Sequence, residues 1–255
     1  MDKKILEQYL DQKLNITIFD ELDSTNNYLK KLGSQGKKEN QLVIALRQTG
    51  GRGRKGRSFY SPSGTGVYFS LLLHPECVIE KSLFLTVMAA VSVAETVMEY
   101  NKNNVKIKWV NDIYIDGKKV CGILTEGSIN PDKKLDYAVV GVGINVIAPE
   151  NGFPNEIKDI ATAIFPGNKE ENIKEKIVAD VVNRFFQMYN GDDNDFIRRY
   201  KEYSYLTGKE INIISGEKTR PAVVLDITDD CRLLVKNKNG EIEEISSGDV
   251  SVRLK

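Results

Sequence analysis

A glycine-rich, basic stretch carries the clearest chemistry in this sequence. Residues 51–57 read Gly-Arg-Gly-Arg-Lys-Gly-Arg and hold four cations and no acidic side chain. Arginine presents a planar pair of donors that fits a phosphate or a carboxylate, and glycine lets the backbone approach a ligand closely. The stretch therefore predicts a loop that binds an anionic group.

The residues after this loop distinguish it from other motifs that share its glycines. The spacing Gly51-x-Gly53-x-x-Gly56 matches the dinucleotide fingerprint and nearly matches a P-loop. Both of those motifs open directly into a helix, whose N-terminus binds phosphate. Here residues 61–64 (Ser-Pro-Ser-Gly) predict a turn, and the β-rich run 67–73 follows. A protein-kinase glycine loop also lies between strands, but the sequence has no His-Arg-Asp or Asp-Phe-Gly motif.

Two further polar segments lie where predicted elements begin or end. Ser24 or Thr25 could cap a predicted helix at its N-terminus, or these hydroxyls together with Asn26 could bind a polar, uncharged ligand group. Lys108 alternates with Ile107 and Trp109 in a predicted strand, so its side chain points away from the apolar face. It faces either a cleft or solvent at a sheet edge, and the residue types alone leave both readings open.

The composition argues against several classes of protein. The 255 residues carry 36 basic and 36 acidic side chains, so the formal net charge is zero, whereas nucleic-acid-binding domains are strongly basic. His74 is the only histidine, which argues against a histidine-dependent triad and a multi-histidine metal site. Cys77, Cys121 and Cys231 are far apart, as expected of reduced thiols in the cytoplasm. We expect neither a signal peptide nor a membrane span, because the first residues are polar and apolar runs stay below about 18 residues.

Hydrophobic periodicity predicts a mixed domain of helices and strands, followed by a segment of short strands. Helices are expected at 1–14, 24–32, 82–100, 157–164, 172–189 and 195–203, and strands at 17–21, 42–46, 67–73, 120–126 and 138–146, with two more within 105–115 around an Asn-Asp break. From Leu206 onward the pattern changes to five short strands separated by tight turns, at 210–214, 222–227, 232–235, 241–245 and 250–254. This second pattern suggests a small SH3-like barrel.

Six segments in this order resemble the biotin–protein ligases, which attach biotin to a lysine of carboxylase carrier domains. They are Asp23–Asn26, Gln48–Arg57 with Ser61-Pro62, Lys108–Asp112, Gly122–Glu126, Gly141–Val146 and Ser247–Arg253. The likeness spans nearly the whole chain and is to the short form, which lacks a DNA-binding repressor domain. Phe59, Val110 and Gly50 stand where the family often has Trp, Pro and Ala, which bears on loop packing and leaves the charged groups intact.

The resemblance implies a fold and a division into domains. The fold is α/β (α+β), with a mixed sheet like that of class II aminoacyl-tRNA synthetases, flanked by helices and followed by the SH3-like barrel. The catalytic domain is expected to cover residues 1–205, and the C-terminal domain residues 206–255.

The resemblance also implies the reaction and the residues that perform it. Biotin and ATP would form biotinyl-5'-AMP, and a carrier lysine would then take the biotinyl group. The catalytic residues would be Lys108 and Arg54, and the biotin-binding residues Ser24, Thr25, Asn26, Gln48, Arg52, Gly53, Arg54, Lys108, Gly122 and Ile123. The ATP-binding residues would be Arg54, Arg57, Asn111, Asp112 and Asn145. Mg²⁺ is expected to arrive with ATP at no dedicated metal site, with Asp112 as a candidate ligand.

The expected partner is the biotin carboxyl carrier protein of acetyl-CoA carboxylase or a similar carboxylase. We expect no direct binding to DNA, no membrane attachment and a cytoplasmic location, and a homodimer stays open. One alternative is a lipoate or octanoate ligase of the same fold, although those enzymes have a different glycine signature. The other is an RNA-binding module that uses the Arg-Gly loop and the barrel.

Overall fold

The computed structural model describes residues 1–75, 81–167, 170–191, 193 and 195–246, and the backbone of 251–254. Cys77 and residues 247–250 of the C-terminal motif lie outside the described residues. Cys121 and Cys231 are both buried free thiols, as expected. Burial raises the pKa of the Cys231 thiol to about 12, so this thiol is protonated at neutral pH.

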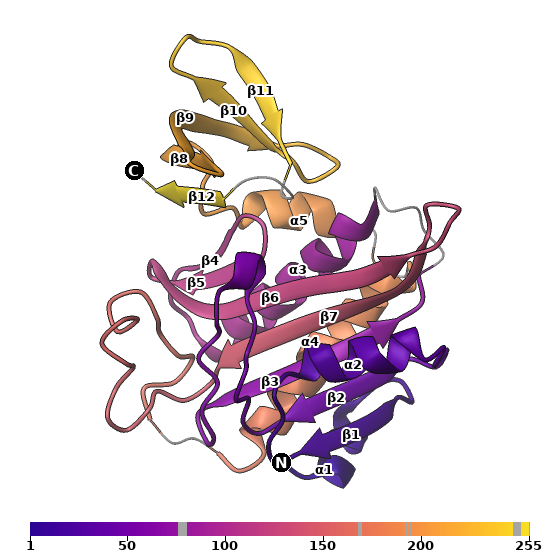
Figure 1. The fold of residues 1–255 in the computed structure, drawn as a ribbon. Helices are drawn as coiled ribbons and strands as arrows, with labels where there is room; N and C mark the ends of the chain where they lie inside the picture. Colours follow the sequence, from indigo (N-terminus) through magenta and orange to yellow (C-terminus); the bar gives the residue numbers. More distant parts are fainter. Residues whose placement is uncertain (76–80, 168–169, 192, 194, 247–250, 255) are drawn as a thin grey trace.

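A mixed sheet of seven strands forms the centre of the molecule, with the strand order β1-β2-β3-β7-β6-β5-β4 (Figure 1). The strands are β1 Asn15–Phe19, β2 Gln41–Ala45, β3 Gly66–Leu73, β4 Val105–Lys108, β5 Asp112–Ile115, β6 Lys118–Ile129 and β7 Leu135–Asn145. β1 and β2 run parallel, and each further neighbouring pair is antiparallel. The expected large mixed sheet flanked by helices is therefore confirmed.

Helices cover both faces of this sheet (Figure 1). The helices are α1 Lys3–Tyr9, α2 Thr25–Ser34, α3 Ser82–Tyr100, α4 Ile173–Tyr189 and α5 Phe196–Glu202. α2 lies on one face, and α3 and α4 lie on the other. By length and composition α3 could cross a membrane, but 61% of its apolar window is buried inside the protein, as in the core helix of a globular domain.

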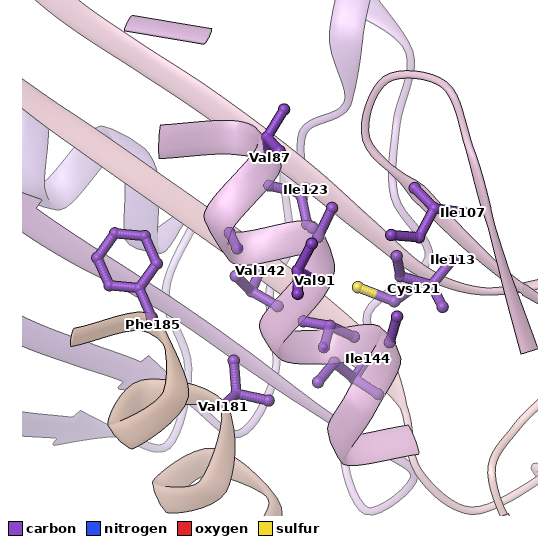
Figure 2. Packing of buried hydrophobic residues seen from close by; sticks show 14 of the residues in the cluster. Val87, Val91, Ile107, Ile113, Cys121, Ile123, Val142, Ile144, Val181 and Phe185 are labelled. Carbon is purple, nitrogen blue, oxygen red and sulfur yellow. The ribbon is translucent and has the colours of Figure 1, made fainter. Parts of the chain in front are cut away.

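Alternation along the strands assigns each residue to one face of the sheet. Figure 2 shows Val142 and Ile144 of β7, with Ile123 of β6, packed against Val87 and Val91 of α3. Gly141 and Gly143 alternate with Val142 and Ile144 along β7 and consequently face α2. Most of the apolar core thus lies on the α3 side. On the α2 side a smaller apolar cluster beneath α2 leaves the rest of that face for polar residues.

The C-terminal segment forms a separate antiparallel sheet with the order β11-β10-β9-β8-β12 (Figure 1). Its strands are β8 Glu210–Ser215, β9 Lys218–Ile227, β10 Leu233–Asn237, β11 Ile242–Ile245 and β12 Ser251–Leu254. The sheet meets the β4–β5 turn, where the Trp109 indole N–H donates to the Cys231 carbonyl at 2.9 Å. The Tyr200 hydroxyl of α5 donates to the Val110 carbonyl at 2.9 Å. The five expected short strands are confirmed.

The helix expected at 157–164 is absent, and residues 155–160 form successive turns instead. Lys119 explains the difference, because its N–H donates to the Ile160 carbonyl and its carbonyl accepts from the Thr162 N–H. This pairing with β6 pulls the chain into an extended path after Ile160, so a helix does not continue. The other expected helices and strands are present, with ends shifted by a few residues.

Candidate active site

The basic loop folds back on itself as a short hairpin. The Phe59 N–H donates to the Gly51 carbonyl at 2.9 Å, and the Gly53 N–H donates to the Arg57 carbonyl at 2.7 Å. Lys55 (φ 55°) and Gly56 (φ 73°) make the tip, where a left-handed backbone suits glycine. The hairpin therefore presents its cations from an ordered stem above the sheet.

A row of five residues in register crosses the α2 face of the sheet beneath this hairpin. Strand pairing aligns Lys108 with Asp112, Asp112 with Gly122, Gly122 with Gly143, and Gly143 with Tyr68. Residues in such a row share a face, and neighbouring strands lie about 4.8 Å apart. Because two adjacent members lack side chains, the row leaves a gap between Asp112 and Tyr68, which we call the glycine slot.

A β-bulge brings a second lysine to the same face. Tyr114 pairs with Lys119 and Ile113 pairs with Cys121, so Val120 is an extra residue without a partner on β5. Without the bulge, residues three apart on β6 would point to opposite faces. With it, Lys119 shares the face of the glycine slot, which fits the role of bulges in re-aiming a side chain near a site.

Neutral polar groups gather at one end of the slot. The Thr25 N–H donates to Gln48 Oε1 at 2.9 Å, and the Ser70 hydroxyl lies 2.7 Å from both Thr25 Oγ1 and Asn26 Oδ1. Asn26 is only 4% exposed, and a methyl group on Gly141 would come within 2.0 Å of its Oδ1. Ser24 caps α2 by accepting from the Asn27 N–H, so the capping hypothesis is confirmed.

Cations gather at the other end of the slot. Lys119 Nζ forms an ion pair with Asp112 at 2.7 Å and lies 3.0 Å from where a Cβ on Gly122 would stand. Lys108 Nζ lies 3.4 Å from the Tyr114 hydroxyl. Arg54 Nη1 donates to Asn111 Oδ1 at 3.2 Å. The slot thus runs from neutral donors and acceptors to a positively charged end.

Burial lowers the pKa of Arg54, although the charge of Asp112 opposes the decrease. The guanidinium still stays charged, because arginine does not lose its proton in proteins. A partly desolvated cation interacts more strongly with an incoming anion than one in bulk water.

A carboxylate holds the stem of the hairpin against β6. Glu126 forms ion pairs with Lys30 at 2.8 Å and with Arg52 at 3.1 Å, and it accepts from Asn26 Nδ2 at 3.0 Å. Burial alone would raise the pKa of Glu126, but these hydrogen bonds and charges produce a net decrease. The ionised form is therefore the one that stabilises the fold.

Replacing Glu126 with Gln is expected to lower the melting temperature most at neutral pH. The lowered pKa means that the stabilisation is complete above the pKa of an unfolded glutamate, about 4.3. It is lost as the pH falls through the lower pKa of the folded protein. Melting curves from pH 7 downward should therefore show the difference between the two proteins shrinking in acid. Glu39→Gln, an exposed ion-pair partner of Lys37, is the control, and a difference independent of pH would contradict the assignment.

A larger cavity of about 440 Å³ lies between the first turn of α3 and β6. Ser82, Leu83 and Thr86 of α3 line this cavity, as do Arg54 and Asn111. This volume falls within the range of small-molecule sites. Arg54 thus borders both the charged end of the glycine slot and this second cavity.

Comparison with known proteins identifies the family of this chain. Residues 18–145 match the biotin/lipoate A/B protein ligase family, and residues 206–253 match the biotin protein ligase C-terminal domain. The chain belongs to the biotin/lipoate A/B protein ligase family. The expected resemblance is therefore confirmed.

The relatives of this ligase-family chain include enzymes and solved structures. It is 33% identical over 241 residues to the bifunctional ligase/repressor BirA of Bacillus subtilis, covering 91% of this chain and 72% of that protein. It is 26% identical over 236 residues to the biotin–[acetyl-CoA-carboxylase] ligase of Mycobacterium tuberculosis, with 89% and 85% covered. The biotin protein ligase from Aquifex aeolicus in complex with biotin and ATP has a TM-score of 0.75 at 29% identity, with 94% and 99% covered.

The structure brings many of the predicted residues of this ligase-family chain together. Those that line the slot are Ser24, Thr25, Asn26, Gln48, Arg52 and Gly122, and those that line the larger cavity are Arg54, Asn111 and Ile123. Lys108 and Asp112 lie in the same strand row as the slot glycines. Gly53 bonds within the hairpin, Arg57 is exposed, and Asn145 donates to the Thr162 carbonyl at 3.0 Å, so these three line neither cavity.

Several contributors were missed as site residues from the sequence. Among them are Phe59, Ser70, Lys119, Gly141 and Gly143. Gly143 carried a usable signal, since a glycine in a buried strand permits a close approach. Lys119 carried none, because the bulge that re-aims it depends on the pairing of β5 with β6.

Proposed function

We propose that this chain is an ATP-dependent biotin–protein ligase that forms biotinyl-5'-AMP and transfers the biotinyl group to a lysine of a carrier domain. One observation carries the proposal: the glycine slot joins a neutral polar end to a cationic end. Biotin has the same sequence of groups, because a ureido ring, an apolar chain and a carboxylate follow one another along the molecule.

The polar end of the slot suits the ureido ring, which both donates and accepts hydrogen bonds. Thr25, Asn26 and Gln48 offer hydroxyl and amide groups that neighbouring side chains already hold in place. Such preorganised groups bind a ligand with little loss of side-chain freedom. Ser24, Arg52, Gly53, Gly122 and Ile123 complete the proposed biotin-binding set.

The cationic end suits the carboxylate and the α-phosphate that it must meet. One carboxylate oxygen attacks the α-phosphorus, and pyrophosphate leaves as the mixed anhydride forms. The carrier lysine amine then attacks the biotinyl carbonyl carbon, and AMP leaves. Both steps require positioning and charge stabilisation more than a protein nucleophile. We assign the charge stabilisation to Arg54, Lys108 and Lys119.

Lys119 is added to the proposed set on geometric grounds. Its ammonium lies at the slot glycine Gly122, whereas Lys108 is two strands from that glycine and contacts Tyr114. We therefore propose that Lys119 binds the biotin carboxylate and that Lys108 faces the phosphates. Arg54, Arg57, Asn111, Asp112 and Asn145 form the proposed ATP-binding set.

We propose that Mg²⁺ enters with ATP and is held chiefly by the phosphates. Among the residues that the structure describes, acidic, histidine and cysteine side chains form no group of three that could hold a metal. Magnesium in nucleotide sites commonly uses one or two carboxylates together with phosphate oxygens and water. The Asp112 carboxylate fits that limited role, and the ion would neutralise phosphate charge.

We further propose the domain boundaries, the protein partner, the cellular location and the assembly of this enzyme. A class II synthetase-like catalytic domain would cover residues 1–205, and an SH3-like barrel residues 206–255. The partner would be the carrier protein of acetyl-CoA carboxylase or a similar carboxylase, in the cytoplasm, with no membrane attachment and with a homodimer as the assembly to test. The zero net charge supports the absence of direct DNA binding.

Intact-mass spectrometry of a biotin carboxyl carrier domain tests this function. The domain is incubated with the enzyme, ATP, Mg²⁺ and either biotin or lipoate. The proposal predicts the mass increase of one biotinyl group per carrier domain and no lipoyl addition. Lipoyl transfer alone would identify a lipoate ligase, and no transfer of either acid would contradict the proposed reaction.

A further inference from the structure

The ring of Phe59 fills the glycine slot. A Cβ on Gly143 would lie 2.6 Å from Cε1 of this ring, and a Cβ on Gly122 would lie 3.2 Å from Cε2. The free cavity left at the slot is about 30 Å³, and a single water needs about 10–15 Å³ of such space, so only a few waters fit. A bicyclic ring lying on these glycines would overlap the Phe59 ring.

The other neighbours of the ring hold it in place. Tyr68 packs against it edge to face, with ring centroids 6.4 Å apart, and Lys119 Nζ lies 5.9 Å from its centroid. Edge-to-face aromatic pairs and cations near an aromatic ring are favourable arrangements. The Phe59 ring therefore contacts the two slot glycines and lies near the Lys119 ammonium. These are the groups that a ligand in the slot would contact.

The backbone of Phe59 is fixed while its side chain is only half-buried. Its N–H donates to the Gly51 carbonyl, and its carbonyl accepts from the Ser61 hydroxyl at 3.0 Å. The Phe59 carbonyl also packs closely on Gly51, where a Cβ would lie 2.5 Å from its oxygen. Rotation of the side chain is thus the simplest way to empty the slot.

We propose that Phe59 gates the glycine slot, because its ring competes with the ring of biotin for the same space. The inference rests on the proposed function, since it takes biotin as the ligand of this slot. Binding then occurs only in the fraction of molecules whose Phe59 has rotated away. The apparent dissociation constant equals the intrinsic one divided by that fraction.

The proposal predicts the kinetics of biotin association. A minor conformation commonly has a population of about 0.1–10%. Removing the ring should therefore raise the association rate constant of D-biotin by about tenfold or more. Phe59→Leu, which fills less of the slot than Phe, should give a smaller increase than Phe59→Ala.

Stopped-flow measurement of D-biotin binding to the full-length chain provides the test. Wild type, Phe59→Ala and Phe59→Leu are compared with Tyr60→Ala, a control at a neighbouring, 40% exposed ring. Circular dichroism and melting temperatures establish that each variant is folded. The proposal predicts faster association in both Phe59 variants and an unchanged rate in Tyr60→Ala.

A ring that only forms a wall of the occupied site would give a different result. Its loss would leave the association rate unchanged and raise the dissociation rate alone, which would overturn the proposal. Failure of the wild type to bind D-biotin at all would instead contradict the proposed function. The two failures are therefore distinguishable.

Discussion

Replacing Lys119 with alanine is expected to slow biotin adenylation by about 10²–10³-fold, the usual effect of removing one group that stabilises developing charge. The ammonium of Lys119 lies at the floor of the glycine slot beside Gly122. It is the cation best placed to bring a carboxylate toward a phosphate. Lys119→Arg should recover only part of the activity, because a planar guanidinium favours one fixed geometry.

Folding should change little in this variant. The ion pair with Asp112 is partly exposed, and such pairs contribute only about 0–1 kcal/mol to stability. Lys118→Ala is the matched control, since Lys118 is the adjacent, exposed lysine on the same strand. Biotin-dependent pyrophosphate exchange and the melting temperature should be measured for both variants.

Comparing Lys108→Ala with Lys119→Ala decides which of these two lysines contributes more to biotin adenylation. The sequence singles out Lys108, whereas the geometry favours Lys119. A larger loss of exchange activity in Lys108→Ala than in Lys119→Ala would support the first assignment and contradict the second. Normal activity in Lys119→Ala would remove Lys119 from the mechanism.

Replacing Gly141 with alanine is expected to weaken biotin binding by roughly 5–150-fold, because a polar group left unpaired in the site costs about 1–3 kcal/mol. The added methyl group would come within 2.0 Å of Asn26 Oδ1, and Asn26 has no free direction in which to move. Its amide donates to the Leu124 carbonyl and to Glu126, and its oxygen lies 2.7 Å from Ser70. The clash must displace a polar group that shapes the ureido end of the slot.

Overpacking of this kind also destabilises a fold, by about 1–3 kcal/mol, so the melting temperature of Gly141→Ala should fall. Titration calorimetry with biotin should be performed below the melting temperature of the variant. Gly167→Ala is the control, because a Cβ at Gly167 meets nothing within 4 Å. Wild-type affinity in a folded Gly141→Ala protein would show that biotin does not use this end of the slot.

Periodicity predicted most of the elements but not their pairing. The apolar stripe of α3 and the continuous burial of β7 follow directly from the sequence, as does the orientation of Lys108 away from the core. Residues 157–164 were wrongly predicted as a helix, because the pairing of Lys119 with Ile160 is a long-range contact. Local patterns do not encode such contacts.

The site shows the same division between local and long-range information. The basic hairpin, the capping hydroxyls and the slot glycine Gly122 could be identified from residue types and motifs. Lys119 depends on a bulge, and Phe59 depends on the register that places Gly122 beside Gly143. Both required the tertiary structure.

Biotin-dependent exchange of labelled pyrophosphate into ATP by the wild-type enzyme tests the central claim most directly. The exchange reports reversible formation of an acyl-adenylate and needs no carrier protein. The label is expected to enter ATP when biotin is present, and neither without an added acid nor with lipoate in its place. Exchange that ignores biotin, or that requires lipoate, would contradict the assignment of the glycine slot to biotin.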